Sequence, residues 1–169
     1  HYKAKEFQDG LSKTLMVSEV KAFTPYVRNT SDPGSTYPAG SPPSDDSQLA
    51  SLAGGGENKL GTTTNKNTGH TEWPDGRVHH NGFTATFTPN TVVEFPVSGV
   101  PYDIDYNSQQ EGKSATQKTF AAITSRSYHN GVVNTGMIDG SIRKITNDIS
   151  LRIWRGLSTR DGGEVANPP

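Results

Sequence analysis

The stretch from Tyr128 to Ile145, YHNGVVNTGMIDGSIRKI, decides the fold. Val132 to Ile138 and Ser141 to Ile145 each read as a short extended segment and predict two strands. The Asp139-Gly140 pair between them is the strongest short signal for a β-hairpin, because a type I′ turn needs positive φ at both central residues. The stretch therefore predicts an antiparallel hairpin with a two-residue turn.

Three further segments predict strands. Thr14 to Val20 follows a turn at Asp9-Gly10 and alternates roughly between apolar or β-branched residues and polar ones. Gly82 to Phe87 alternates like an edge strand, and Phe120 to Arg126 supplies another strand. Together with the hairpin, these segments predict a mainly antiparallel β-sheet.

A short helix is predicted after the hairpin. Asn147 is placed to cap it, and its apolar residues recur at helical spacing on one face. These residues are Ile149, Ile153, Trp154 and Leu157. Arg152 and Arg155 are expected to point outward. One short C-terminal helix beside a sheet gives an α+β fold.

Composition predicts one domain over residues 1–169, because 169 residues is about the size of a single domain. Hydrophobic residues make up only 30% of the chain, so the core is small and the loops are long. Residues 28–69 are rich in Ser, Thr, Pro, Gly and Asn and lack helical or alternating periodicity. We expect a long surface insertion there, or else a small subdomain, with Tyr26 and Tyr37 as interface anchors.

Several classes of protein are disfavoured by composition. The formal net charge is -1, and no basic block is present to neutralise a run of phosphates, so no nucleic-acid partner is expected. The absence of cysteine excludes disulfides, thiol catalysis and thiolate metal sites. No stretch approaches the roughly 18 apolar residues that cross a bilayer.

Four blocks in order carry a resemblance to a known family. His129, followed after nine residues by Asp139 and Gly140, is similar to the signature of the prepilin-type processing-associated H-x(9)-D-G family. This family consists of pseudopilin-like proteins of planctomycetes and related bacteria. The early segment DGLSKTLMVSE, which begins at Asp9-Gly10, resembles the family's D-G-x-S-N-T-x-x-x-G-E segment. Lys13 replaces the usual Asn there, and Ser18 replaces the usual Gly.

The other two blocks lie later in the chain. HTEWPDGRVHHNGFTATFTPN, residues 70–90, resembles the family's middle block, and WRGLSTRDGGEV, residues 154–165, resembles its closing block. The matching residues of the closing block are Trp154, Leu157, Thr159, Arg160, Gly162, Gly163 and Glu164. The four blocks together span nearly the whole chain outside the insertion.

The resemblance implies a type IV pilin-like protein. Such proteins carry an N-terminal hydrophobic helix, which a prepilin peptidase processes, ahead of a globular domain with a β-sheet. The N-terminal pilin helix is absent from this chain, so we expect that it was removed or that it belongs to a separate polypeptide, as in split pilins. Either case places the globular domain outside the cytoplasm, at the cell surface, in the periplasm or in the medium. Membrane contact would come only through the missing helix.

His129 is expected to be structural. The spacing suggests that His129 and Asp139 approach each other around the hairpin, with a ring nitrogen reaching Asp139 or a backbone carbonyl. Such a contact would fix the register of the strands, which matters because a slip of one residue turns every side chain to the wrong face.

Two groups of residues are candidate metal ligands. Asp103, Asp105, Asn107 and Glu111 have a partly EF-hand-like spacing, with Ser108 where the loop needs Gly, and make calcium the candidate cofactor. The densest collection of ligands is His70, Glu72, Asp75, His79 and His80. It lacks the P-C-x-x-C partner of the zinc deaminases and the H-E-x-x-H helix, so ordinary packing is favoured over zinc.

Two functions remain open. The first is a non-enzymatic type IV pilin-like or pseudopilin-like subunit of a filament or a secretion-type assembly. Its partners would be further copies, other pilin-like subunits or a separate helical pilin chain. The second is a periplasmic or cell-surface module that binds glycan or calcium and does not polymerise. No enzyme is expected, because no G-x-S-x-G elbow occurs and no nucleophile can be paired with a base.

Overall fold

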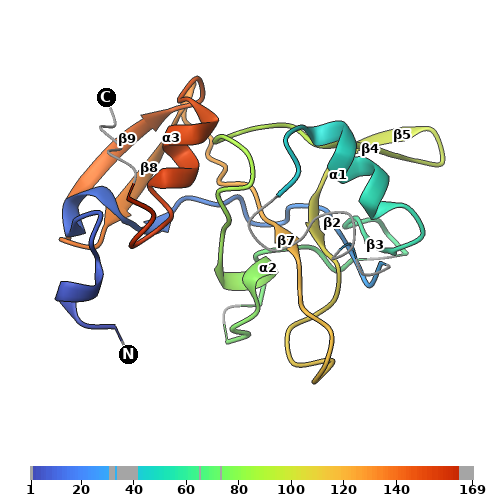
Figure 1. Ribbon diagram of the computed structural model, residues 1–169. Helices are drawn as coiled ribbons and strands as arrows, with labels where there is room; N and C mark the ends of the chain where they lie inside the picture. The colour runs from blue at the N-terminus through green and yellow to red at the C-terminus, as the bar shows by residue number, and fades with distance from the viewer. Residues whose placement is uncertain (1, 31–32, 34–41, 65, 73, 164–169) are drawn as a thin grey trace.

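The computed structural model describes residues 2–30, 33, 42–64, 66–72 and 74–163, which form an α+β fold with mainly antiparallel sheets and a short C-terminal helix (Figure 1). The predicted fold class is confirmed. The helices are η1 (Ala4–Glu6), η2 (Leu11–Lys13), α1 (Asp46–Ala53), α2 (Val78–Asn81) and α3 (Leu151–Gly156). The strands are β1 (Leu15–Ser18), β2 (Tyr26–Arg28), β3 (Glu57–Lys59), β4 (Glu94–Val97), β5 (Val100–Asp103), β6 (Asp105–Asn107), β7 (Ala121–Ala122), β8 (Val132–Met137) and β9 (Ile142–Thr146).

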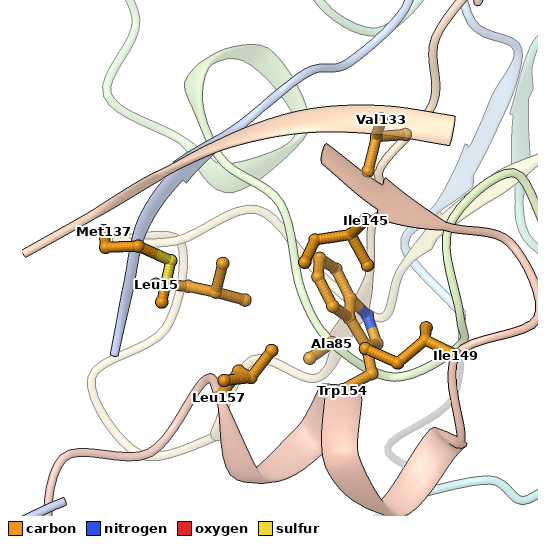
Figure 2. Close-up of a cluster of buried hydrophobic side chains, with 8 residues drawn as sticks. All are labelled: Leu15, Ala85, Val133, Met137, Ile145, Ile149, Trp154 and Leu157. Carbon is orange, nitrogen blue, oxygen red and sulfur yellow. The ribbon is translucent and has the colours of Figure 1, made fainter. Parts of the chain in front are cut away.

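The predicted hairpin forms the centre of one antiparallel sheet, of order β1-β8-β9. Helix α3 packs beside this sheet, and a cluster of buried apolar side chains fills the space between them (Figure 2). The cluster consists of Leu15, Ala85, Val133, Met137, Ile145, Ile149, Trp154 and Leu157. Alternation along β8 and β9 places Val133, Met137 and Ile145 on this inner face.

The turn of the hairpin differs from the predicted two-residue type I′ turn. The Met137 amide donates to the Ser141 carbonyl (2.9 Å), which leaves three residues in the loop. The Gly140 amide donates to the Met137 carbonyl (3.0 Å), and Gly140 alone in the loop has positive φ, at 85°. This is the arrangement of three-residue hairpin loops, in which the last loop position is left-handed and favours glycine. The Asp-Gly signal therefore marks the hairpin correctly but not the turn type.

Helix α3 buries the predicted face. Trp154 and Leu157 are fully buried, and Ile153 packs against the same cluster. Two details of the prediction are wrong. The N-cap is Ser150, because the side chain of Asn147 instead accepts a hydrogen bond from Asn90 Nδ2 (2.7 Å). Arg155 does not point into solvent, since its Nη2 donates to the carbonyls of Thr86 (2.7 Å) and Pro43 (2.6 Å).

A second sheet, of order β3-β2-β6-β7, lies beside the first (Figure 1). Its β2-β6 pair is parallel, and its other pairs are antiparallel. A second cluster of buried side chains packs around it, and β4 and β5 form a separate antiparallel ribbon. The cluster contains Val27, Leu49, Ala53, Phe87, Val93, Ile104, Tyr106 and Ala122.

Residues 28–69 contain regular structure that the sequence did not indicate. Helix α1 begins after Asp45, whose Oδ1 accepts from the Gln48 amide (3.0 Å), and it buries Leu49 and Ala53 in the second cluster. Strand β3 pairs with β2. Tyr26 is fully buried and so is not an interface anchor, whereas Tyr37 lies outside the described residues.

The strand expected from Gly82 to Phe87 is wrong. Thr84 makes a single parallel bridge with Thr124, and the Thr84 hydroxyl then accepts the Ile123 amide (3.0 Å). The Thr84 hydroxyl thus accepts the hydrogen bond that a backbone carbonyl would accept in a continued strand pairing, and the pairing does not extend beyond this bridge. Among the helices of the described residues, none has the length and apolar character needed to cross a membrane.

Candidate functional site

His129 contacts the early block and not Asp139. Its Nε2 lies 3.2 Å from Glu19 Oε1, directly after β1. The Glu19 carboxylate also accepts hydrogen bonds from the amide (2.7 Å) and Nδ2 (2.9 Å) of Asn134. Burial raises the pKa of Glu19, but these hydrogen bonds and His129 together hold it below its ordinary value. His129 therefore helps to join β1 to β8 through Glu19.

The hypothesised contact between His129 and Asp139 does not form, because strand β8 separates them and extended chain keeps its ends apart. Asp139 closes the hairpin loop instead. Its Oδ1 accepts from the amide (2.9 Å) and the hydroxyl (2.6 Å) of Ser141. The hydroxyl and amide of Ser141 lower the pKa of Asp139.

Asp9 joins the two ends of the described chain. Its carboxylate accepts from the amides of Gly162 and Gly163 (both 2.9 Å) and from the Thr159 hydroxyl (3.1 Å). Gly10 follows with φ 100°, in the left-handed region that favours glycine. The early block thus holds the closing block directly. We refer to these four hydrogen-bonded residues, Asp9, Thr159, Gly162 and Gly163, as the Asp9 clamp.

Arg126 is the principal buried cation, and the sequence did not single it out. Its guanidinium donates to Asp103 through Nε (3.1 Å) and Nη2 (2.8 Å), and through Nη1 to Asp105. Arg126 is 3% exposed and Asp105 is 1% exposed. Burial raises the pKa of Asp105, but Arg126, His70 and the Thr124 amide outweigh burial and lower it. The positive charge that stabilises the buried Asp105 carboxylate therefore comes from Arg126.

The four predicted calcium ligands divide into two pairs with separate partners. Asp103 and Asp105 both form ion pairs with Arg126, whose guanidinium provides the positive charge that a calcium ion would have provided. Asn107 Nδ2 lies 3.1 Å from His79 Nδ1, and Glu111 Oε1 accepts the Val78 amide (2.9 Å). The predicted oxygen cage is therefore not formed. The four residues lie on strands β5 and β6 and in the turn that follows, so they do not belong to one loop that could bring their oxygen atoms together.

The densest group of ligands in the sequence does come together. Helix α2 carries His79 and His80, both buried, and the His79 ring stacks on Tyr26 with centroids 4.8 Å apart. Burial lowers the pKa of His79 to about 4 and also lowers the pKa of His80. His70 Nδ1 lies 3.2 Å from the His80 carbonyl, and its Nε2 lies 3.6 Å from Asp105 Oδ2.

One end of this histidine cluster opens on a cavity of about 180 Å³. The cavity is lined by Val20, Ala22, His70, His80 and Asn81. Beside it, Glu72, Asp75 and His80 each offer a ligand atom, and these atoms lie within 4.8 Å of one another. The sequence indicated all three residues as ligands, although it favoured packing over metal binding. The two carboxylates and the His80 imidazole can together hold a cation near the protein surface.

Comparison with known proteins identifies a family over most of the chain. A family model described as protein of unknown function DUF1559 (SBP_bac_10) matches residues 1–152. No curated protein and no solved structure matches the chain. Since the match to the family model covers most of the sequence, the chain belongs to the DUF1559 (SBP_bac_10) family.

Proposed function

We propose that the chain is a non-enzymatic, pilin-like or pseudopilin-like subunit, which acts outside the cytoplasm in an extracellular filament or a secretion-type assembly. Membership of the DUF1559 family is compatible with this role, and the ordered blocks of the sequence add the pilin-like character. Its partners are further copies of the chain or other pilin-like subunits.

The observation that carries the proposal is what the signature residues contact. Asp9 accepts hydrogen bonds from the closing block, and Glu19 pairs with His129 and Asn134. Asp139 accepts a hydrogen bond from the Ser141 hydroxyl within its own loop. A catalytic acid or base must reach a substrate proton, whereas these carboxylates already hold the chain together. This pattern supports a scaffold more than a reaction site.

A surface suited to assembly lies on the outer face of the first sheet. Gly136 on β8 is paired with Val17 of β1 on one side and with Ile142 of β9 on the other. Val17 is 52% exposed and Ile142 is 73% exposed. A Cβ on Gly136 would lie 2.8 Å from Val17 Cγ2, so a larger residue there would require the Val17 side chain to shift. Burying exposed apolar surface stabilises association, and this pair is the contact that we expect a neighbouring subunit to cover.

The alternative function, a surface module that binds glycan, has one observation in its favour. A hollow of about 280 Å³ is lined in part by Phe23, Tyr102 and Tyr128, with Asp103 and Arg126 beside them. Phe23 is 74% exposed and Tyr128 is 87% exposed. Exposed aromatic rings next to charged hydrogen-bonding groups are suited to the apolar face and the hydroxyls of a sugar.

Electron microscopy of native, full-length material, with mass spectrometry of its N-terminus, tests the proposal. We expect regular filaments or assemblies that contain this chain, with an apolar helix either covalent or supplied by a partner. Val17→Lys should reduce assembly, because it places a charge in the apolar contact. Val92→Lys is the matched control, since Val92 is 58% exposed outside this sheet. Dispersed monomers whose N-terminus carries no helix would favour the binding module instead.

A further inference from the structure

The Glu72, Asp75 and His80 side chains converge at one end of α2. One ligand atom from each lies within 4.8 Å of the others. Glu72 and Asp75 lie in the loop before the helix, and His80 lies within it. The three therefore come from a single short segment, which the turn before α2 folds back on itself through a hydrogen bond from the Asp75 amide to the Glu72 carbonyl (3.0 Å).

His80 is the unusual member of the group. It is 6% exposed, and its buried Nδ1 has no hydrogen-bond partner in the described part of the chain. Its Nε2 points at the carboxylates, 3.8 Å from Glu72 Oε2, which is beyond hydrogen-bond distance. Burying a polar ring without partners is unfavourable. A cation between Nε2 and the two carboxylates would give the buried ring a partner at Nε2.

The two carboxylates are available to such a ligand. Glu72 has a side chain that is 53% exposed, and its ion-pair contact with a described residue is His80 itself. Asp75 Oδ2 contacts Arg77 Nη1 at 2.8 Å, and Asp75 Oδ1 accepts the Arg77 amide (3.0 Å). The Arg77 side chain is 39% exposed, so its pair with Asp75 is weak and can yield to a more strongly bound cation.

We propose that Glu72, Asp75 and His80 bind a divalent transition-metal ion, with Zn²⁺ as the representative. One imidazole nitrogen with two carboxylate oxygens suits zinc, whereas calcium takes 6–8 oxygen ligands, roughly twice what this group offers. Three protein ligands leave a further position for water or a small anion. Of the three ligands, His80 also lines the cavity that it shares with His70.

Calorimetric titration of Zn²⁺ into protein freed of metal with EDTA tests the site. We expect saturable binding of one ion per chain, and no comparable binding of Ca²⁺. Glu72→Gln keeps the shape of an exposed side chain but removes its charge. It should weaken Zn²⁺ binding more than about tenfold, since even residues behind a metal ligand contribute 10–100-fold. His80→Gln should abolish binding, provided that circular dichroism shows an intact fold.

His129→Gln is the matched control. His129 is paired with a glutamate, as His80 is, but its side chain is exposed and it lies at the other sheet. This variant should bind Zn²⁺ as the wild type does. Replacing Zn²⁺ by Co²⁺ gives a second readout, because its visible absorption should report nitrogen and oxygen ligands and should be lost in Glu72→Gln. Absent Zn²⁺ binding, or binding that Glu72→Gln leaves unchanged, would overturn the proposal.

Discussion

Replacing Arg126 with methionine is expected to lower the free energy of unfolding by about 3–5 kcal/mol, the usual cost of leaving one partner of a buried ion pair uncompensated. Asp105 is 1% exposed, and its Oδ2 accepts no hydrogen bond from a described residue. Without Arg126, its charge would be buried with only the Thr124 amide (3.0 Å) and His70 beside it. Urea denaturation at pH 7 measures the loss.

The pH dependence of this loss identifies its cause. In the wild type the pKa of Asp105 is lowered, so its contribution to stability is present above its unfolded pKa and is lost as pH falls through the folded value. In Arg126→Met the same carboxyl would be buried without a cation, so its pKa should rise. The deficit of the variant should therefore shrink as pH falls from 7 toward 4. A deficit that stays constant would contradict the electrostatic explanation.

Arg160→Met supplies the control for the Arg126 variant. Its ion pair with Asp161 (3.5 Å) joins two side chains that are 36% and 50% exposed. Exposed pairs of this kind contribute about 0–1 kcal/mol, so this substitution should change stability little.

Trp154→Ala is expected to cost about 3–5 kcal/mol, because it empties the centre of the first hydrophobic cluster. Trp154 is fully buried between α3 and the sheet (Figure 2). The centroid of the Phe83 ring lies 6.2 Å from that of Trp154. Its Nε1 has no hydrogen-bond partner among the described residues, so Trp154→Phe removes an unsatisfied donor along with part of the volume. Trp154→Phe should therefore cost clearly less than Trp154→Ala.

Chemical denaturation of the two Trp154 variants gives these values. Ile142→Ala is the reference, because Ile142 belongs to the same sheet but is 73% exposed. Its effect should stay within about 0.5 kcal/mol. If Trp154→Ala cost no more than Ile142→Ala, the packing of α3 on the β1-β8-β9 sheet would be wrong.

The parts of the fold that the sequence predicts are those with local signals. The hairpin follows from two extended segments around Asp139-Gly140, and α3 follows from four apolar residues at helical spacing. Helix α1 escaped prediction because it buries only Leu49 and Ala53, too few residues for a visible period. The Asp-Gly pair did not distinguish a two-residue turn from a three-residue loop, because both place glycine at positive φ.

The polar contacts of the site depend on pairings that are distant in sequence. Arg126 meets Asp103 and Asp105 only because β6 pairs with β7 and the chain continues past Thr124. The spacing of the two aspartates indicated a metal-binding loop. In extended chain, however, residues that are two positions apart also place their side chains on the same side. By contrast, Glu72, Asp75 and His80 lie within one short segment, and the sequence placed them in its densest collection of possible ligands, although it favoured ordinary packing for that collection.

The blocks of the sequence hold distant parts of the chain together, as the Asp9 clamp does. Hydrogen exchange of the Gly162 and Gly163 amides, followed by NMR, tests it most directly. We expect Asp9→Ala to speed this exchange about tenfold or more, since hydrogen bonds to a charged group contribute about 1.5–3 kcal/mol. Asp161→Ala, in the same loop but outside the clamp, should leave it nearly unchanged. Equal exchange in Asp9→Ala and the wild type would contradict the claim.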